Sequence, residues 1–219
     1  MSQHLSPVHV VLASASPARK RLLHAAGIEP SIMVSDVDED AATAAALETY
    51  GELAPEDVAL VLARAKAEDV AAQVDDAIVI GCDSILDLDG DGHGKPANAE
   101  EAIARWQRMR GHSGVLHTGH WLIDTRQDDD ATGATLGATA STTVHFAAID
   151  DDEIRAYVET GEPLRVAGSF TIDGLGAPFV SGIEGDYSNV VGLSLPLLRE
   201  LLAAVGIAWH TVRAPGIPT

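Results

Sequence analysis

The chain has 219 residues, of which 46% are hydrophobic, and a formal net charge of −19 at pH 7. Length and composition predict one compact domain, and the negative charge argues against broad binding to nucleic acids or anionic membranes. No window approaches the roughly 20 apolar residues of a membrane span, and no basic segment precedes an apolar one at the N-terminus, so we expect neither insertion nor secretion. Cys82, the only cysteine, cannot form an internal disulfide and fits a cytoplasmic location.

The N-terminal segment predicts a strand followed by a phosphate-binding turn. Residues 8–13 are a β-branched apolar run, and Ser16 and Pro17 are typical of an N-cap and first helical residue. Free N–H groups at a helix N-terminus suit phosphate. Ser14 and Ser16 add two hydroxyls, and Arg19, Lys20 and Arg21 add three cations. The alternative is an ordinary strand–helix connection. The Walker A pattern is absent.

Two lysines are candidates for contacts with an anion. A second strand is expected over 31–35, followed by an acidic segment and by a helix that begins at Pro55. Lys66 lies near the apolar face of that helix, and its amine either reaches into a cleft or extends along the surface into solvent. Lys95 lies in a Gly-Lys-Pro loop before a helix with Asn98 as its N-cap, so a rigid loop presents it.

Asp83 is the anomaly of the next predicted strand, residues 77–86. Aspartate is disfavoured in strands, and an unpaired buried carboxylate costs roughly several kcal/mol. We therefore expect Asp83 to face a polar cleft, a cation or a metal, with a structural ion pair to an arginine as the alternative. Residues 87–92 resemble the start of a calcium loop. However, Lys95 and Asn98 occupy later ligand positions, which favours a hairpin turn.

The second half of the chain predicts further alternation of strands and helices. The polar stretch 124–139 is expected to be a solvated loop. Three histidines lie on strand or loop with no cysteine nearby, which argues against a zinc site: His112, His117 and His120. The expected strands and helices are strands 115–123, 142–147, 167–172 and 207–212, and helices 150–160 and 195–205.

Eight short motifs follow one another along nearly the whole chain. They are LAS-x-SP-x-R-x-x-LL from residue 12, VDE from 37, LA-x-x-KA from 62, DS from 83, GKP from 94, TG from 118, AGSF from 167 and NVVGL from 189. Each motif is weak alone, but their order is specific. Together they resemble the Maf family of nucleoside triphosphate pyrophosphatases.

This resemblance implies an α/β fold with an elongated mixed central sheet flanked by helices and two lobes around a cleft. It implies a single Maf-like domain over residues 1–219, commonly a homodimer. The implied reaction hydrolyses the bond between the α- and β-phosphates of a nucleoside triphosphate, including non-canonical or modified ones in a housecleaning role, with Mg²⁺ or Mn²⁺. The alternatives are a non-catalytic nucleotide-binding regulator of septum formation and a related-fold hydrolase of deaminated purine triphosphates.

The resemblance also implies roles for single residues. Asp83 would activate the attacking water, and Glu39 and Asp83 would hold the metal, with Asp38 as the alternative to Glu39. The substrate-binding residues would be Ser14, Ser16, Arg19, Lys66, Lys95, Ser84 and Asp173.

Three positions depart from the known specificity patterns of the family. Where the members that prefer dTTP and UTP carry arginine, threonine and glutamine, this chain has Ala18, Ser84 and Asp173. The pattern of the members that prefer 7-methyl-GTP is not met either. Asp173 is a hydrogen-bond acceptor, so it would favour a base that offers N–H donors.

Overall fold

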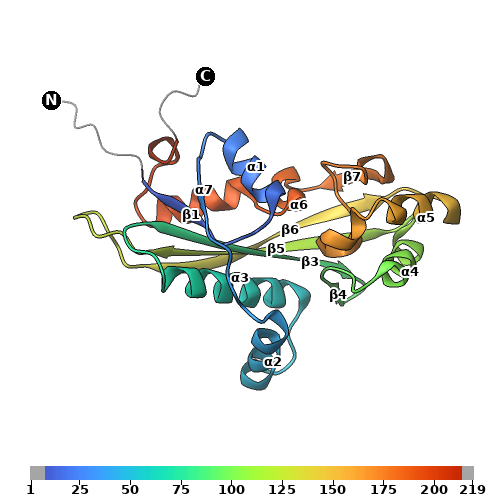
Figure 1. Cartoon of the computed structure of the whole chain (residues 1–219), viewed down its shortest axis with the longest axis horizontal. Coiled ribbons are helices and arrows are strands. Elements are labelled where there is room, and N and C mark those ends of the chain that lie inside the picture. The colour runs from blue at the N-terminus through green and yellow to red at the C-terminus, as the bar shows by residue number, and fades with distance from the viewer. Residues whose placement is uncertain (1–7, 214–219) are drawn as a thin grey trace.

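A mixed seven-stranded sheet forms the centre of the molecule, and helices flank it (Figure 1). The computed structural model describes residues 8–213, so the two ends of the expected domain lie outside the described residues. The expected mixed α/β architecture is confirmed. The strands are β1 (Val10–Leu12), β2 (Ser31–Ile32), β3 (Ile78–Leu88), β4 (Asp91–His93), β5 (Ser113–Asp124), β6 (Thr135–Phe146) and β7 (Val180–Glu184).

The helices cover both faces of this sheet. In the described residues no helix combines the length and the apolar character that a membrane crossing requires. The helices are α1 (Pro17–Ala25), α2 (Glu39–Tyr50), α3 (Pro55–Ala71), α4 (Ala99–Met109), α5 (Asp151–Glu159), α6 (Tyr187–Val191) and α7 (Leu195–Ala204). Short 3₁₀ turns add η1 (Pro163–Arg165), η2 (Ala167–Ser169), η3 (Ala177–Phe179) and η4 (Trp209–Thr211).

The strand order is β2-β1-β3-β5-β6-β7, with β4 paired to β3. β1 runs parallel to β2 and β3, whereas the other pairs are antiparallel. One edge of β3 is divided, because β1 pairs with residues 78–80 and β4 with residues 86–88. Within the described chain, no strand pairs with this edge over residues 81–85. The sheet therefore has a gap beside the middle of β3.

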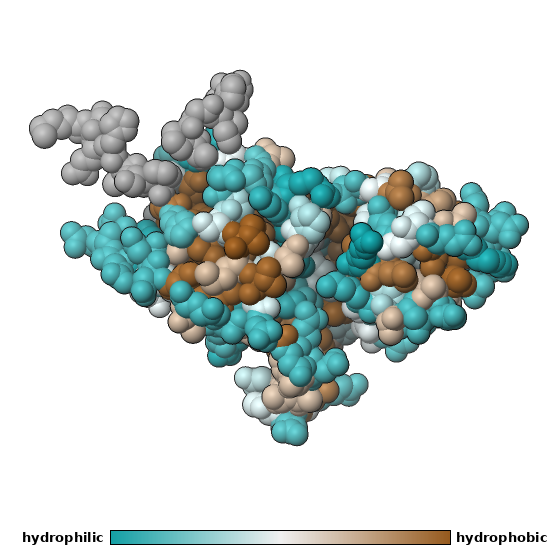
Figure 2. All heavy atoms as spheres, in the orientation of Figure 1, coloured by the Kyte–Doolittle hydropathy of each residue, from teal (hydrophilic) through white to brown (hydrophobic). Residues whose placement is uncertain are grey.

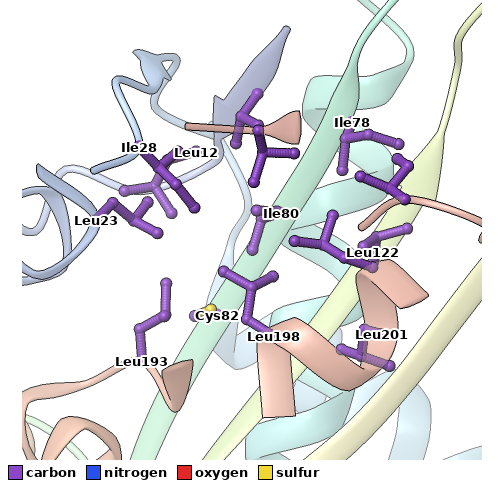
Figure 3. Packing of buried hydrophobic residues seen from close by; sticks show 14 of the residues in the cluster. Leu12, Leu23, Ile28, Ile78, Ile80, Cys82, Leu122, Leu193, Leu198 and Leu201 are labelled. Carbon is purple, nitrogen blue, oxygen red and sulfur yellow. The ribbon is translucent and has the colours of Figure 1, made fainter. Parts of the chain in front are cut away.

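Three apolar clusters pack along β3, and the two larger ones lie at its two ends. The first joins the start of β3 to α1 and α7, and Figure 3 shows Ile80 and Cys82 beside Leu198 of α7. The second joins the end of β3 to α4, α5 and β6, and Trp106 is its largest fully buried side chain. Apolar burial of this kind is the main favourable contribution to folding. Long central strands thus tie the two halves together.

Helix α3 lies on the opposite face of the sheet from α7 and is seated on two glycines. A Cβ at Gly81 would lie 2.2 Å from the carbonyl oxygen of Ala63, and one at Gly119 would lie 2.3 Å from that of Ala59. Only glycine permits so close an approach of helix backbone to strand. The position of α3 matters because this helix carries Lys66.

Two of the predicted strands are wrong. Residues 167–172 form the 3₁₀ turn η2 and an irregular segment, because Gly168 and Ser169 have φ values of 69° and 62°. Trp106 holds this turn by donating from Nε1 to the Ser169 carbonyl at 2.8 Å. Residues 207–212 contain the turn η4, and their apolar side chains pack into the first cluster instead of a sheet.

Other boundaries were partly predicted. β6 begins at Thr135, so the predicted loop over 124–139 is shorter than expected. The hairpin predicted for residues 87–92 is confirmed, since Asp89 and Gly90 form the turn between β3 and β4 with φ values of 58° and 92°. α2 and β7 were not predicted from the sequence.

A methyl group at Gly119 should displace α3. Gly119→Ala places its Cβ against the Ala59 carbonyl, and we expect a loss of about 3 kcal/mol or more in the free energy of unfolding. Gly182→Ala is the matched control, because its Cβ would meet only His145 at an ordinary 3.5 Å. Urea unfolding of both variants checks this. Equal stabilities would contradict the close seating of α3.

Buried His120 should make stability depend on pH. Its Nδ1 donates to the Thr118 carbonyl, and its Nε2 accepts from the Ser194 N–H at 2.8 Å. Burial lowers the pKa of His120 to about 4. The unfolded chain therefore binds a proton that the folded chain does not, and the free energy of unfolding should fall by roughly 3 kcal/mol as pH drops from about 6.5 to 4.

Urea titrations at several pH values measure this loss. His120→Gln should flatten the pH dependence in that window, whereas His112→Gln, which changes an exposed side chain, should not. The same slope in His120→Gln and in the wild type would contradict the assignment.

Candidate active site

A cleft opens at the gap in the sheet beside the middle of β3. It has a volume of about 650 Å³ and is walled by α1 and the start of α2 on one side and by residues 160–174 on the other. In Figure 2 the surface is hollowed between the half that carries α1 and the half that carries α4 and α5. Five cationic and four acidic side chains line it: Arg19, Arg21, Lys66, Lys95, Arg165, Glu39, Asp83, Glu162 and Asp173. In a chain with a net charge of −19, the cleft is thus locally basic.

Lys66 joins two carboxylates inside this cleft. Its Nζ lies 2.5 Å from Oδ1 of Asp83 and 2.7 Å from Oε1 of Glu39. The Lys66 and Asp83 side chains are 12% and 13% exposed, so the ammonium does not extend into solvent. An ammonium has three N–H donors, and these contacts use two of them. The third remains for an anion.

Burial and Lys66 act in opposite directions on these two carboxyls. Burial raises the pKa of Asp83 above its ordinary value, although Lys66 and Arg19 oppose it. Burial also raises the pKa of Glu39, but its hydrogen bond to Lys66 and the charges of Lys66 and Lys95 outweigh that and leave it lowered. The more buried Asp83 is therefore the better proton acceptor of the two.

Asp38 has a different task from its neighbour Glu39. Its Oδ1 accepts from the Ala41 N–H at 2.9 Å, so it is the N-cap of α2. Glu39 is the first residue of that helix, and its carboxylate turns into the cleft. The geometry favours Glu39 over Asp38 as the second acidic residue of the site.

Arg19 is committed mainly to the framework of the cleft. Nε donates to the Gly192 carbonyl at 2.6 Å, Nη1 to the Cys82 carbonyl and to Ser14 Oγ, and Nη2 to Ser84 Oγ. Four of its five N–H groups are thus used inside the protein. Arg19 holds α1 against the unpaired edge of β3, and a substrate contact through its remaining N–H stays a prediction.

Ser84 extends the hydrogen-bond network of Arg19 to Thr118 on β5. Thr118 donates its hydroxyl proton to the Asn189 carbonyl at 3.2 Å, so the Ser84 hydroxyl must donate to Thr118 Oγ1 at 2.9 Å. Ser84 also accepts from Arg19. Its hydroxyl proton is therefore engaged, although the side chain lies in the cleft wall.

Among residues 8–213, no acceptor takes the hydroxyl proton of Ser14 or of Ser16. Ser14 Oγ accepts from the Ser16 N–H and from Arg19, and Ser16 Oγ accepts from the Arg19 N–H as the N-cap of α1. As predicted, Pro17 begins the helix. Two hydroxyl donors and a helix N-terminus thus face the cleft, an arrangement that suits phosphate.

Lys95 approaches the cleft from the loop between β4 and α4. Arg105 fixes that loop by donating to the Gly94 carbonyl at 2.6 Å, and the Gly168 N–H donates to the same oxygen at 3.1 Å. Lys95 itself is exposed and lines the cleft. Its ammonium is presented from a fixed backbone.

Asp173 lies in the opposite wall and pairs with Arg21, one of the cations predicted for the phosphate-binding turn. Nη2 of Arg21 on α1 lies 3.1 Å from Oδ2 of Asp173. Glu162 and Arg165 also line this wall and were not predicted. Arg165 has no distinguishing signal in the sequence, so only the fold indicates its place in the cleft.

The donor set fits a divalent ion of the magnesium kind. In residues 8–213 no three His, Cys, Asp or Glu side chains converge so that they could hold a metal by themselves. Mg²⁺ is commonly held by one or two carboxylates, with water and phosphate oxygens as the other ligands. Glu39 and Asp83, drawn together by Lys66, provide such a pair.

Comparison with known proteins agrees with the motifs. The model of the family described as "Maf-like protein" matches residues 9–205. A nucleoside triphosphate pyrophosphatase of Streptomyces coelicolor is 56% identical over 208 residues, which cover 94% of this chain and 95% of the relative. One from Salinispora tropica is 56% identical over 206 residues, covering 92% and 85%.

A solved structure of a nucleoside-triphosphatase (dITP/XTP pyrophosphatase) from Mycobacterium abscessus also matches. The match covers 91% of this chain and 95% of the chain in that structure, at 15% identity and a TM-score of 0.33. At that level of similarity it supports no conclusion about this chain. The family model and the curated relatives suffice: the chain belongs to the Maf-like protein family.

Proposed function

We propose that this protein is a nucleoside triphosphate pyrophosphatase, which hydrolyses the bond between the α- and β-phosphates and releases the monophosphate and pyrophosphate. The observation that carries the proposal is the contact of Lys66 with both Glu39 and Asp83 in a cleft with free hydroxyl and ammonium donors. The two relatives that are 56% identical are both named nucleoside triphosphate pyrophosphatases, which supports the same activity.

The binding step rests on the donors that the protein leaves free. The hydroxyls of Ser14 and Ser16 and the N-terminus of α1 take phosphate oxygens on one wall. Lys95 and the third N–H of Lys66 neutralise the triphosphate from the other side. Arg19 and Ser84 keep these groups in place, since most of their donors are used internally.

The chemical step rests on Asp83. Its carboxylate accepts a proton from the water that attacks the phosphorus, a role favoured by its raised pKa and its place in the cleft. Phosphate oxygens that bind the Lys66 ammonium weaken its hold on Asp83 and leave that carboxylate free to take the proton. Glu39 and Asp83 would hold Mg²⁺ or Mn²⁺. When bound, the metal would stabilise charge on the phosphates and acidify the water.

The main alternative is a nucleotide-binding regulator of septum formation without catalysis. Such a module would need the phosphate-binding turn at Ser14 and Ser16, but it would not need a pair of carboxylates opposite that turn. The contacts of Glu39 and Asp83 with Lys66 in the cleft therefore favour an enzyme. Binding of nucleotide without any turnover would favour the regulator.

Several finer features belong to the same proposal. Asp173 contacts the base and favours one with N–H donors, because it is an acceptor in the cleft wall. A housecleaning role on non-canonical or modified nucleotides, a cytoplasmic location, a two-lobed single domain and a homodimer follow from the family resemblance and the lone Cys82.

Loss of the Asp83 carboxylate should abolish turnover. We expect Asp83→Asn to lower kcat for pyrophosphate release by about a hundredfold or more, because the proton acceptor is removed. Asp87→Asn is the matched control. It lies on the same strand outside the described lining of the cleft, and asparagine can still accept from the Gly90 N–H. Retained activity in Asp83→Asn would contradict the assigned role.

Glu39 and Asp38 should differ in their effect on the metal requirement. We expect Glu39→Gln to raise the Mg²⁺ concentration for half-maximal activity at least about tenfold, since a direct or water-mediated ligand is lost. Asp38→Asn should leave it near the wild-type value, because asparagine also caps a helix. Magnesium titrations of both variants measure this. A larger increase of this Mg²⁺ concentration in Asp38→Asn than in Glu39→Gln would assign the metal ligand to Asp38.

A further inference from the structure

An ion pair joins the two walls of the cleft. Nη2 of Arg21 on α1 lies 3.1 Å from Oδ2 of Asp173, which belongs to the segment after η2. The side chains are 63% and 22% exposed, so this is a surface pair of small intrinsic strength. A ligand that binds in the cleft can therefore compete with Arg21 for Asp173.

The segment that carries Asp173 is fixed from behind. The Glu162 carboxylate accepts from Thr171 Oγ1 at 2.6 Å and from the N–H groups of Leu175 and Gly176, each at 3.0 Å. Asp173 lies between these anchored residues. Because the backbone around Asp173 is fixed, the number of acceptor sites that its carboxylate presents to the cleft depends on the groups that it already binds.

Arg21 engages one of the two oxygens of that carboxylate. A carboxylate with both oxygens free can accept two parallel N–H bonds, such as those from N1–H and the 2-amino group of guanine. Arg21 already binds Oδ2, so an N–H of the base that reaches this oxygen must share it with the guanidinium or displace Arg21. One bond does not separate guanine from hypoxanthine, which lacks the amino group.

We propose that Arg21 is a specificity-determining residue: by competing for Oδ2 of Asp173 across the cleft, it weakens a second N–H bond from the base to this carboxylate and so lowers selection of guanine over hypoxanthine. The proposal rests on the proposed function, because it takes a nucleotide as the ligand and Asp173 as a contact of its base.

The ratio of kcat/KM for GTP to that for ITP tests this proposal. Arg21→Gln should raise the ratio by roughly threefold to tenfold, the net worth of one added hydrogen bond. The same substitution in an Asp173→Asn background should leave the ratio unchanged, because the effect passes through the carboxylate. Lys20→Gln removes the same charge from the neighbouring residue of α1, which is exposed and outside the described lining, and should have no effect.

The proposal is overturned if the GTP-to-ITP ratio of kcat/KM is unchanged in Arg21→Gln. It is also overturned if Lys20→Gln raises the ratio as much as Arg21→Gln does, or if Arg21→Gln raises it as much in the Asp173→Asn background as in the wild type. The same set of variants built on Asp83→Asn gives Kd values for GTP and ITP by calorimetry without turnover. If the wild type releases no pyrophosphate, the proposed function fails, and the Kd ratio still decides the role of Arg21. Absence of any nucleotide binding would overturn both.

Discussion

The contact of the Lys66 ammonium with Glu39 and Asp83 is the interaction on which the cleft depends. It joins three elements, since Glu39 begins α2, Lys66 lies on α3 and Asp83 lies in the middle of β3. Two carboxylates this close would repel each other without a cation, and a mostly buried Asp83 would become protonated. The close seating of α3 on Gly81 and Gly119 brings the lysine to this point.

The side chains of the cleft divide into those that hold the site and those that remain free to bind. Arg19 and Ser84 use most of their donors on Gly192, Cys82 and Thr118, all distant in sequence. The hydroxyls of Ser14 and Ser16 and the ammonium of Lys95 face the cleft. Since the whole chain is strongly acidic, we expect binding of a triphosphate to depend on this local excess of donors.

How far the sequence predicts the structure depends on the kind of signal at each residue. Asp83 was identifiable because a carboxylate within an apolar strand needs a partner, and the Ser16–Pro17 helix start because capping chemistry is local. The alanine-rich helix α2 escaped prediction, since most of its side chains are exposed and show no apolar period. Residues 167–172 have the composition of a strand, but the positive φ values of Gly168 and Ser169 impose a turn. The Arg21–Asp173 pair joins residues 152 positions apart, and only the fold brings them together.

The central claim is that the groups around Lys66 direct water to the α-phosphorus of a nucleoside triphosphate. Hydrolysis in ¹⁸O-labelled water, followed by ³¹P NMR of the products, tests it most directly. The account predicts pyrophosphate and a monophosphate, with the label in the monophosphate. Release of orthophosphate and a nucleoside diphosphate, or label in the pyrophosphate, would contradict it.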